Sequence, residues 1–377
     1  MGAAAVGGAA LGAVSTGAPT EVDPTGDLTV DFHGRHQAGI EMEPQAHQTL
    51  VALDLRAGVD AEAVRRLLRL LTDDAERLAS GRAPLADLEP ELAAVPARLT
   101  VTFGFGAGLV AAVRGRGNVP AWLGPLPAFR RIDRLQERWN GGDLLLQVAA
   151  DDPTTVAHAL RLLVRDSRAF ATVRWRQDGF RHAAGTHRPG TAMRNLFGQV
   201  DGSANEAPGS SGFERVVWRD DDEAWLDGGT TMVVRRIAMN LDTWDEVGRT
   251  GREFSIGRRL ADGAPTTGGT EADDVDLDAV DERGFTVVGP AAHARRARTD
   301  DDTQRIFRRG YNYDDASGTG LVFSAFQADL EHQFVPIQAR LAEMDALNAW
   351  TTPIGSAVFA IPRGVRPGEH VGEALFT

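Results

Sequence analysis

Side chains that could do chemistry gather in two short stretches of the sequence. The first is RNLFGQVDGSAN at residues 194–205, which contains Asp201. The second runs from His293, in AHAR, to Arg308, in RIFRRGYNY, 15 residues later. An imidazole can ligate a metal, a carboxylate can carry a proton, and a guanidinium supplies permanent positive charge. Taken alone, the run GQVDG predicts only a turn. Taken alone, Arg308 is equally typical of a surface residue in a salt bridge.

Patterns for other kinds of chemistry are missing from the sequence. None of the nine histidines belongs to an HExxH or HxH pattern, so a hydrolytic zinc site is poorly supported. There is no GxxxxGK[ST] phosphate loop and no GxSxG nucleophile elbow. Cysteine is absent, which excludes disulfides, thiol catalysis, iron–sulfur clusters and thiolate-ligated haem. His158 and His332 fall in predicted helices, and we expect core or surface histidines there.

The overall charge narrows the range of partners. The 377 residues include 53 acidic and 40 basic side chains, a formal net charge of −13. A net acidic chain argues against nucleic acid or an anionic membrane as the main partner. The length allows two domains of ordinary size or one large fused unit.

The first half of the chain has the pattern of a ferredoxin-like unit. Apolar runs and their periodicity predict strands and helices in the order β-α-β-β-α-β. The predicted strands are residues 49–55, 99–105, 144–149 and 171–180, and the predicted helices are residues 60–71 and 154–164.

The second half repeats this pattern more weakly. LLLQVAADDPTTVAHALRLL and LVFSAFQADLEHQFVPIQARL each predict a strand, an acid-marked turn and a helix. We therefore expect two similar α+β halves, packed through their sheets with helices outside. Residues 263–284 predict an exposed acidic loop. The expected elements are strands at residues 232–239 and 321–327, a helical turn at 241–247 and a helix at 330–341.

The N-terminus has the composition of an export signal. Residues 1–19 are small and apolar, and the first charge is Glu21. The mild, glycine-rich run is typical of twin-arginine signals more than of Sec signals, which places an arginine pair upstream of Met1. A disordered Ala/Gly tail is the alternative, and glycine disfavours a transmembrane helix.

Taken together, the two stretches resemble the dye-decolorizing peroxidase family. Gly198, Asp201 and Gly202 match its GxxDG motif. His293 in HxR matches its proximal haem ligand, and Arg308 in FRRGYNY matches its distal arginine. Blocks in the family's order also match from residue 34 to residue 362. These blocks are GRHQAGI, VVRRIAMNLDTWD, IGRRLADGAP, LVFSAFQADLEHQFVPIQARL and TTPIGSAVFAIP.

The resemblance implies a fold and a cofactor. The fold is α+β, with two ferredoxin-like domains, antiparallel sheets and peripheral helices, the DyP-type dimeric α/β barrel. The implied division is a signal or tail at residues 1–33, an N-terminal domain at 34–212 and a C-terminal haem-binding domain at 213–377. One haem b per chain is implied, with His293 as the iron ligand. The other implied cofactor contacts are Asp201, Gly202, Ser203 and Arg308, of which Asp201 and Arg308 are catalytic.

The implied activity is that of a haem-dependent peroxidase. It reduces H₂O₂ through a ferryl intermediate and oxidises dyes, phenols or other one-electron donors, including metal ions. Two alternatives stay open: a deferrochelatase-like enzyme that releases iron from haem, and a non-catalytic haem-binding protein in iron acquisition. The similar subgroup is exported by the twin-arginine route, to the periplasm, cell envelope or medium. Iron-uptake or oxidase proteins are further candidate partners, and an oligomer is compatible with the family.

Some details depart from the family or stay open. Gln199 and Val200 replace an aromatic residue and a lysine, which should alter the edge of the pocket. Residues 298–300, RTD, replace an NPR turn that helps to seat the haem. Asp329, Asp345 and Asn348 are the candidate acceptors for the second ring nitrogen of His293. Residues considered for relaying electrons from the surface are Tyr311, Tyr313, Trp218, Trp225, Trp244 and Trp350.

Overall fold

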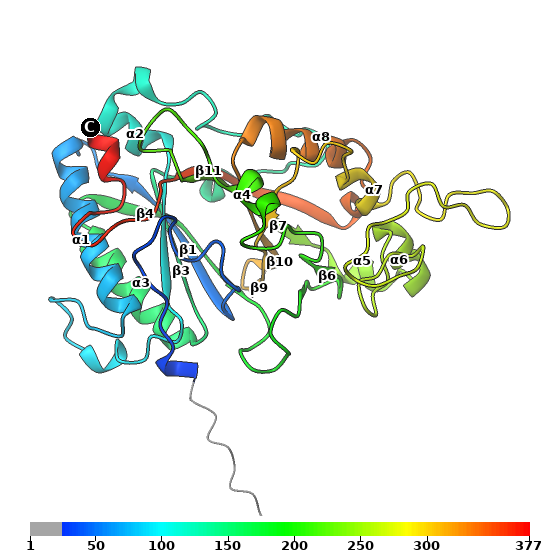
Figure 1. The fold of residues 1–377 in the computed structure, drawn as a ribbon, viewed down its shortest axis with the longest axis horizontal. Coiled ribbons are helices and arrows are strands. Elements are labelled where there is room, and N and C mark those ends of the chain that lie inside the picture. Colours follow the sequence, from blue (N-terminus) through cyan, green and yellow to red (C-terminus); the bar gives the residue numbers. More distant parts are fainter. Residues whose placement is uncertain (1–24) are drawn as a thin grey trace, which may run out of the picture.

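A single closed sheet organises the computed structural model, which describes residues 25–377. Its nine strands have the order β7-β11-β2-β3-β1-β4-β9-β10-β8, and β7 also pairs with β10, which closes a barrel (Figure 1). The predicted export signal at residues 1–19 lies outside the described residues. The strands of this sheet are β1 (His47–Leu55), β2 (Thr100–Phe105), β3 (Leu144–Ala150), β4 (Ala171–Phe180), β7 (Thr230–Met239), β8 (Phe307–Arg308), β9 (Tyr311–Asp315), β10 (Gly318–Gln327) and β11 (Thr351–Ile361). A separate two-stranded sheet consists of β5 (Met193–Arg194) and β6 (Val200–Asp201).

Helices cover the outside of this barrel (Figure 1). The α-helices are α1 (Ala61–Ala79), α2 (Ala107–Arg114), α3 (Pro153–Ser167), α4 (Ser211–Val217), α5 (Leu241–Asp245), α6 (Arg249–Ile256), α7 (His293–Ala297) and α8 (Val335–Met344). The short helices are η1 (Thr25–Asp27), η2 (Pro90–Leu92), η3 (Arg116–Asn118), η4 (Glu137–Trp139), η5 (Leu330–Phe334), η6 (Ala346–Ala349) and η7 (Glu373–Phe376). None of the helices within residues 25–377 is both long enough and apolar enough to cross a membrane.

The two halves of the chain follow the same strand path. The first half has the strand order β2-β3-β1-β4 and the second β9-β10-β7-β11. In each, the first and third strands are central and the second and fourth are at the edges, as in a ferredoxin-like unit. The predicted α+β fold of two such halves is therefore confirmed. The division into residues 34–212 and 213–377 stays a prediction, because both halves share one sheet.

The halves meet edge to edge within one sheet, which agrees with the barrel implied by the family resemblance. The two seams are narrow: β11 pairs with β2 only at Ala360 and Phe105, and β4 pairs with β9 only at Phe180 and Asn312. Edge joining leaves fewer unpaired backbone groups than two open sheets would.

The segment at residues 37–45 reinforces both seams. Gln37 Nε2 donates to Phe103 O at 3.0 Å and to Pro362 O at 2.9 Å, which ties β2 to the end of β11. At the other seam, the buried Arg309 donates from Nη1 to Ile40 O at 3.1 Å. The HQAGI block is therefore explained by barrel closure.

Helix boundaries follow caps and apolar spacing. Asp60 caps α1, which continues to Ala79, beyond the predicted end at residue 71, because its buried stripe continues through Leu78. In the second half, the predicted helix at residues 330–341 divides into the π-helix η5 and α8. Pro336 explains the division, because a proline inside a continuous helix would clash with the preceding turn.

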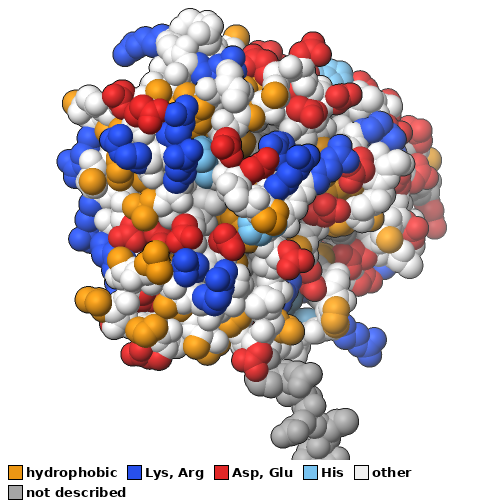
Figure 2. Space-filling view, turned by 60° about the vertical axis from the view of Figure 1, so that its left-hand side comes forward, with side chains coloured by type: hydrophobic (Ala, Val, Ile, Leu, Met, Phe, Trp, Pro, Cys, Tyr) orange, Lys and Arg blue, Asp and Glu red, His pale blue; other side chains and the backbone are white. Residues whose placement is uncertain are grey.

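Exposed segments of the fold are rich in charge. On the face in Figure 2, acidic and basic side chains are interspersed. The predicted acidic loop at residues 263–284 belongs to a segment that projects from the barrel (Figure 1). Its base is held by Arg258, which donates to Gly263 O and Glu271 O at 2.8 and 2.9 Å. The loop is thus anchored at its base.

A buried acid pair lies between α1 and α3. Burial raises the pKa of Asp74 from its ordinary value of 3.8 to about 7, and the hydrogen bond and charge of Asp166 add to this shift. Asp166 is itself paired with Arg165 at 2.7 Å. Asp74 therefore holds a proton in the fold at pH values where the unfolded chain has lost it.

We predict that Asp74→Asn removes a pH dependence of stability. Because the pKa of Asp74 is raised in the folded state, its contribution to the free energy of unfolding is full below pH 3.8. That contribution is lost as the pH rises to about 7. At pH 8 the free energy of unfolding of the variant should exceed that of wild type by an amount on the order of 2 kcal/mol. At pH 4 the two free energies of unfolding should be equal. Urea titrations at both pH values measure this difference. Asp73→Asn, on an exposed side of the same helix, is the control, and an equal gain there would contradict the prediction.

Candidate active site

The side chains of Asp201, Arg308 and His293 lie close enough for their charges to interact. Asp201 ends the short strand β6, Arg308 ends β8, and His293 begins α7. Arg308 Nη1 lies 3.4 Å from Asp201 Oδ1. The charge of Arg308 lowers the pKa of His293, whereas that of Asp201 raises it. Segments far apart in the sequence therefore bring a carboxylate, a guanidinium and an imidazole together.

A tight turn presents Asp201. The strands β5 and β6 form a two-stranded hairpin that pairs Met193 with Asp201. Gly198 and Gly202 have φ values of +78° and +105°, which side chains other than glycine adopt only with strain. A Cβ added at Gly202 would meet only Asn205 Nδ2, at 3.8 Å. Backbone conformation, rather than lack of space, therefore explains this glycine.

Asn205 connects the Asp201 turn to the strand of Arg308. Its Nδ2 donates to Arg308 O at 2.8 Å, and its Oδ1 accepts from Arg308 N at 3.0 Å. These two bonds fix the backbone of Arg308 against the turn. Ser203, on the same turn, is half-buried. Sequence reasoning did not assign a role to Asn205, although its place in the run DGSAN was the available signal.

Asp345 fixes the orientation of His293. His293 Nδ1 donates to Asp345 Oδ2 at 2.6 Å, and Asp345 Oδ1 accepts from Leu347 N at 3.0 Å. Burial alone would lower the pKa of His293, but the charge and hydrogen bond of Asp345 outweigh it and raise the pKa. Because Nδ1 is committed to this bond, Nε2 is the ring nitrogen left for another ligand.

This geometry decides between the three acceptors that the sequence left open. Asp345 is the acceptor, as described above. Asp329 instead caps η5 by accepting from the backbone N–H groups of Glu331 and His332, each at 2.9 Å. Asn348 Nδ2 donates to Leu341 O at 2.8 Å. Only one of the three therefore acts on His293.

Arg258 contributes a further positive charge to the surroundings of Arg308. Burial lowers the pKa of Arg258 and the charge of Arg308 lowers it further, whereas the acidic side chains of the projecting segment raise it. The guanidinium of Arg258 donates to backbone oxygens of that segment and so holds it in place.

The residues that depart from the family pattern have local roles. Gln199 is buried, and its Oε1 accepts from Asn195 Nδ2 at 2.9 Å, so it stabilises the turn before Asp201. Arg298 pairs with Asp274 at 3.1 Å, at the base of the projecting segment. The effect of these departures on the edge of the pocket stays a prediction.

The other candidate residues have structural surroundings. Tyr311 and Tyr313 are buried in the barrel, so neither tyrosine provides a surface relay on its own. His158 is a core histidine, because its Nε2 lies 3.0 Å from the buried Asp87. His332 is exposed and bonds Thr303 at 2.8 Å. The expectation of core and surface histidines is therefore confirmed.

The residues present fit haem ligation. His293 lies at an interior position, yet 32% of its side chain is accessible. An accessible Nε2 and a carboxylate on Nδ1 are what a neutral imidazole ligand of haem iron requires. Among the described residues, the one other cluster of His, Asp and Glu is at Asp87, Glu89 and His158. That cluster already contains the internal pair of His158 and Asp87.

Comparisons with known proteins identify relatives over nearly the whole chain. Residues 37–181 match the family model "Dyp-type peroxidase, N-terminal", and residues 192–366 match "Dyp-type peroxidase, C-terminal". A DyP-type peroxidase structure from Cellulomonas bogoriensis is 52% identical, with a TM-score of 0.90 over 93% of this chain and 99% of that one.

Two curated relatives carry different names. A dye-decolorizing peroxidase of Thermobifida fusca is 38% identical over 359 residues, which cover 90% of this chain and 83% of that protein. A deferrochelatase of Escherichia coli K12 is 33% identical over 371 residues, which cover 91% of this chain and 86% of that protein. Similarity alone therefore leaves the finer activity open.

We predict that Asp345→Asn weakens the bond between His293 and haem iron. The variant keeps an oxygen for Leu347 N but loses the negative charge beside Nδ1, which makes the imidazole a poorer donor. Haem affinity should fall roughly 10- to 100-fold, and the iron reduction potential should rise. Haem titration and redox titration measure these effects.

Asp329→Asn is the matched control for this prediction. Asp329 also caps a helix, but it makes no bond to His293. A loss of stability with unchanged haem affinity and potential is expected. If both variants change the potential equally, Asp345 has only a structural role.

Proposed function

Because the chain belongs to the Dyp-type peroxidase family, and is therefore a haem peroxidase, we propose that His293 binds the haem iron and that Asp201 and Arg308 act on H₂O₂. When bound, the haem supplies an iron centre that can accept oxidising equivalents from peroxide and pass them to a donor. The observation that carries this assignment is the convergence of three groups: the Arg308–Asp201 contact of 3.4 Å and the electrostatic action of both on His293.

The proposed role of Asp201 is proton transfer. Its carboxylate takes the proton from one oxygen of H₂O₂ and delivers it to the other, which then leaves as water. A carboxylate suits both steps, because it can accept and return one proton without other change. The β5–β6 hairpin holds this group on a short, glycine-flanked turn.

The proposed role of Arg308 is electrostatic. Its guanidinium keeps a positive charge at every working pH and can donate a hydrogen bond to the departing oxygen. Asn205 holds the Arg308 backbone at two points, so the guanidinium starts from a fixed position. His293 is oriented separately, through Asp345. Each of the three groups thus has its own support.

We predict that Asp201→Asn and Arg308→Leu slow the reaction with peroxide without removing the haem. Loss of a positioned proton-transfer group typically costs roughly 10²–10⁴-fold. Stopped-flow absorption with H₂O₂ measures the rate, and the Soret band of the resting protein measures the haem content. His293→Ala should instead lose the Soret band.

Arg305→Leu is the matched control. Arg305 precedes β8, the strand that Arg308 ends, and it pairs with Glu206 and Asp302 at the surface. Its rate should stay close to that of wild type. Peroxide rates in Asp201→Asn and Arg308→Leu that equal the control rate would reject the proposed roles.

The electron donor is a small molecule or a metal ion in this proposal. Dyes are supported by the name of the Thermobifida fusca relative, and phenols are candidate donors of the same one-electron kind. Iron release from haem is a second candidate activity, and the name of the deferrochelatase relative supports it. We predict oxidised donor and intact haem after turnover with H₂O₂. Chromatography of the pigments tests this, and free porphyrin without iron as the main product would favour the second activity.

Export by the twin-arginine route is also part of the proposal. It is supported by the small, apolar composition of residues 1–19. Cell fractionation of the native host, with and without a working twin-arginine pathway, tests it. Protein that stays in the cytoplasm of both strains would contradict export. Proteins of iron uptake and peroxide-producing oxidases are the candidate partners at that location.

A further inference from the structure

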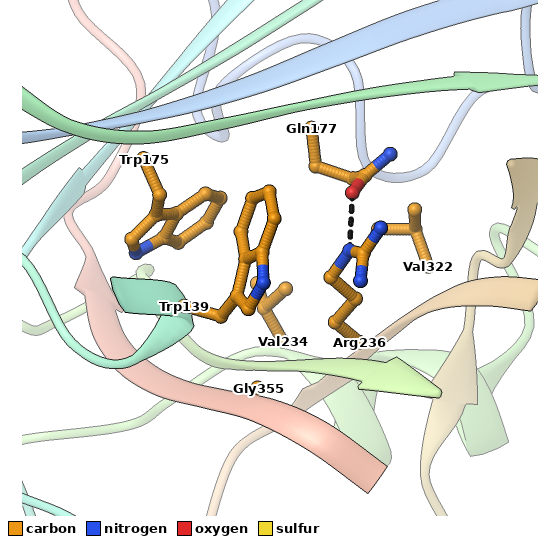
Figure 3. Close-up of a pocket in the computed structure, with 7 residues that line it drawn as sticks. All are labelled: Trp139, Trp175, Gln177, Val234, Arg236, Val322 and Gly355. Atoms are coloured by element: carbon orange, nitrogen blue, oxygen red, sulfur yellow. Dashed lines mark hydrogen bonds between the residues drawn. The ribbon is translucent and has the colours of Figure 1, made fainter. Parts of the chain in front are cut away.

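A small cavity lies inside the barrel, away from the residues assigned to peroxide. Its walls come from η4 and from strands β4, β7, β10 and β11, and Figure 3 shows the side chains that line it. The cavity volume is about 10 Å³, which corresponds to a single small occupant. Its lining includes Trp139, Trp175, Gln177 and Arg236.

Arg236 is a buried cation between two aromatic rings. Its Cζ lies 4.2 Å from the centre of the Trp139 ring and 4.1 Å from that of Tyr313. Only 4% of Arg236 is exposed. Its Nε donates to Gln177 Oε1, as drawn in Figure 3, and its Nη2 donates to Ser317 Oγ at 2.5 Å. Two of its nitrogen atoms are therefore satisfied by side chains.

Two N–H donors at this place have no acceptor among residues 25–377. They are Arg236 Nη1 and Trp139 Nε1, and both atoms are buried. A buried donor without a partner is destabilising, because it has given up its hydrogen bonds to water. The N–H of the other tryptophan in the wall is satisfied, because Trp175 Nε1 donates to Gly141 O at 2.8 Å. The cavity wall thus offers donors in need of an acceptor.

The local charge is positive. The nearest carboxylate oxygen to Arg236 is Asp315 Oδ1, 3.7 Å from Nη2, and Asp315 is partly exposed. A second guanidinium, Arg138, lies 5.4 Å from the centre of the Trp139 ring. Burial is the main cause that lowers the pKa of Arg236; Tyr313 and Asp315 raise it in part, and the charge of Arg138 lowers it. An extra negative charge beside Arg236 would offset this cost.

The backbone of β11 leaves room for Trp139 because it has a glycine at position 355. A Cβ added at Gly355 would lie 2.7 Å from Trp139 Cβ and 3.1 Å from Arg236 Cβ, so a larger residue would displace one of them. The β11 pairing with β7 also shifts register between Pro353 and Gly355. Such bulges commonly redirect side chains at a sheet.

We propose that this cavity binds one small monovalent anion of the halide class, held by Arg236 Nη1 and Trp139 Nε1. A halide only accepts hydrogen bonds, which matches a wall that supplies unpaired donors next to a positive charge. A water molecule would bring two hydrogens of its own, and no unpaired side-chain acceptor lines the cavity among the described residues. The site is separate from Asp201, Arg308 and His293, and it does not depend on their proposed roles.

Crystals of the haem-loaded protein grown in sodium bromide test the proposal directly. An anomalous bromine peak is expected within hydrogen-bond distance of Arg236 Nη1 and Trp139 Nε1. Ordinary electron density for water, without an anomalous peak, would overturn the proposal.

Thermal unfolding tests the same site in solution. At constant sodium concentration, replacing gluconate by bromide should raise the melting temperature of the haem-loaded protein by roughly 2 °C, with saturation. Trp139→Phe keeps an aromatic ring on Arg236 but removes the N–H, and it should lose at least half of that shift. Trp175→Phe removes an N–H that is already paired, so it should keep the shift. Equal shifts in wild type and Trp139→Phe, or equal losses in both variants, would contradict an anion held by that N–H.

Discussion

The 2.6 Å hydrogen bond from His293 Nδ1 to Asp345 Oδ2 constrains the rest of the candidate site. It sets which ring nitrogen is free, and it places a negative charge behind the imidazole. Asp345 is in turn held by Leu347 N, at the start of η6. A ligand bound at Nε2 is therefore oriented through a short chain of contacts that ends in the backbone. Iron chemistry at this position depends on that chain.

The barrel brings the opposing groups to the same place. Asp201 comes from a hairpin after the first half of the sheet, and Arg308 comes from β8 in the second half. Asn205 ties the two together through the Arg308 backbone. The narrow seams at Ala360 and Asn312, reinforced by residues 37–45, keep the two halves from moving apart. Closure of the sheet and the geometry of the site thus each depend on a few contacts between distant segments.

Local patterns predicted most strands and the two long helices, because their apolar spacing continues over many residues. Helix α2 was missed, since its run AGLVAAVR carries no polar face and has a glycine near its start. Edge-to-edge closure could not be derived locally, because each seam joins distant segments through a single pair. The identities of Asp201, His293 and Arg308 came from the family resemblance, since GQVDG and AHAR have ordinary structural explanations. The acceptor Asp345 was one of three candidates of similar chemistry, and only the folded arrangement separates them.

The most direct measurement is a crystal structure of the haem-loaded protein. We expect a bond between iron and His293 Nε2, with Asp201 and Arg308 on the opposite side of the porphyrin plane. Iron bound by a different residue, or both polar groups on the same side as His293, would contradict it.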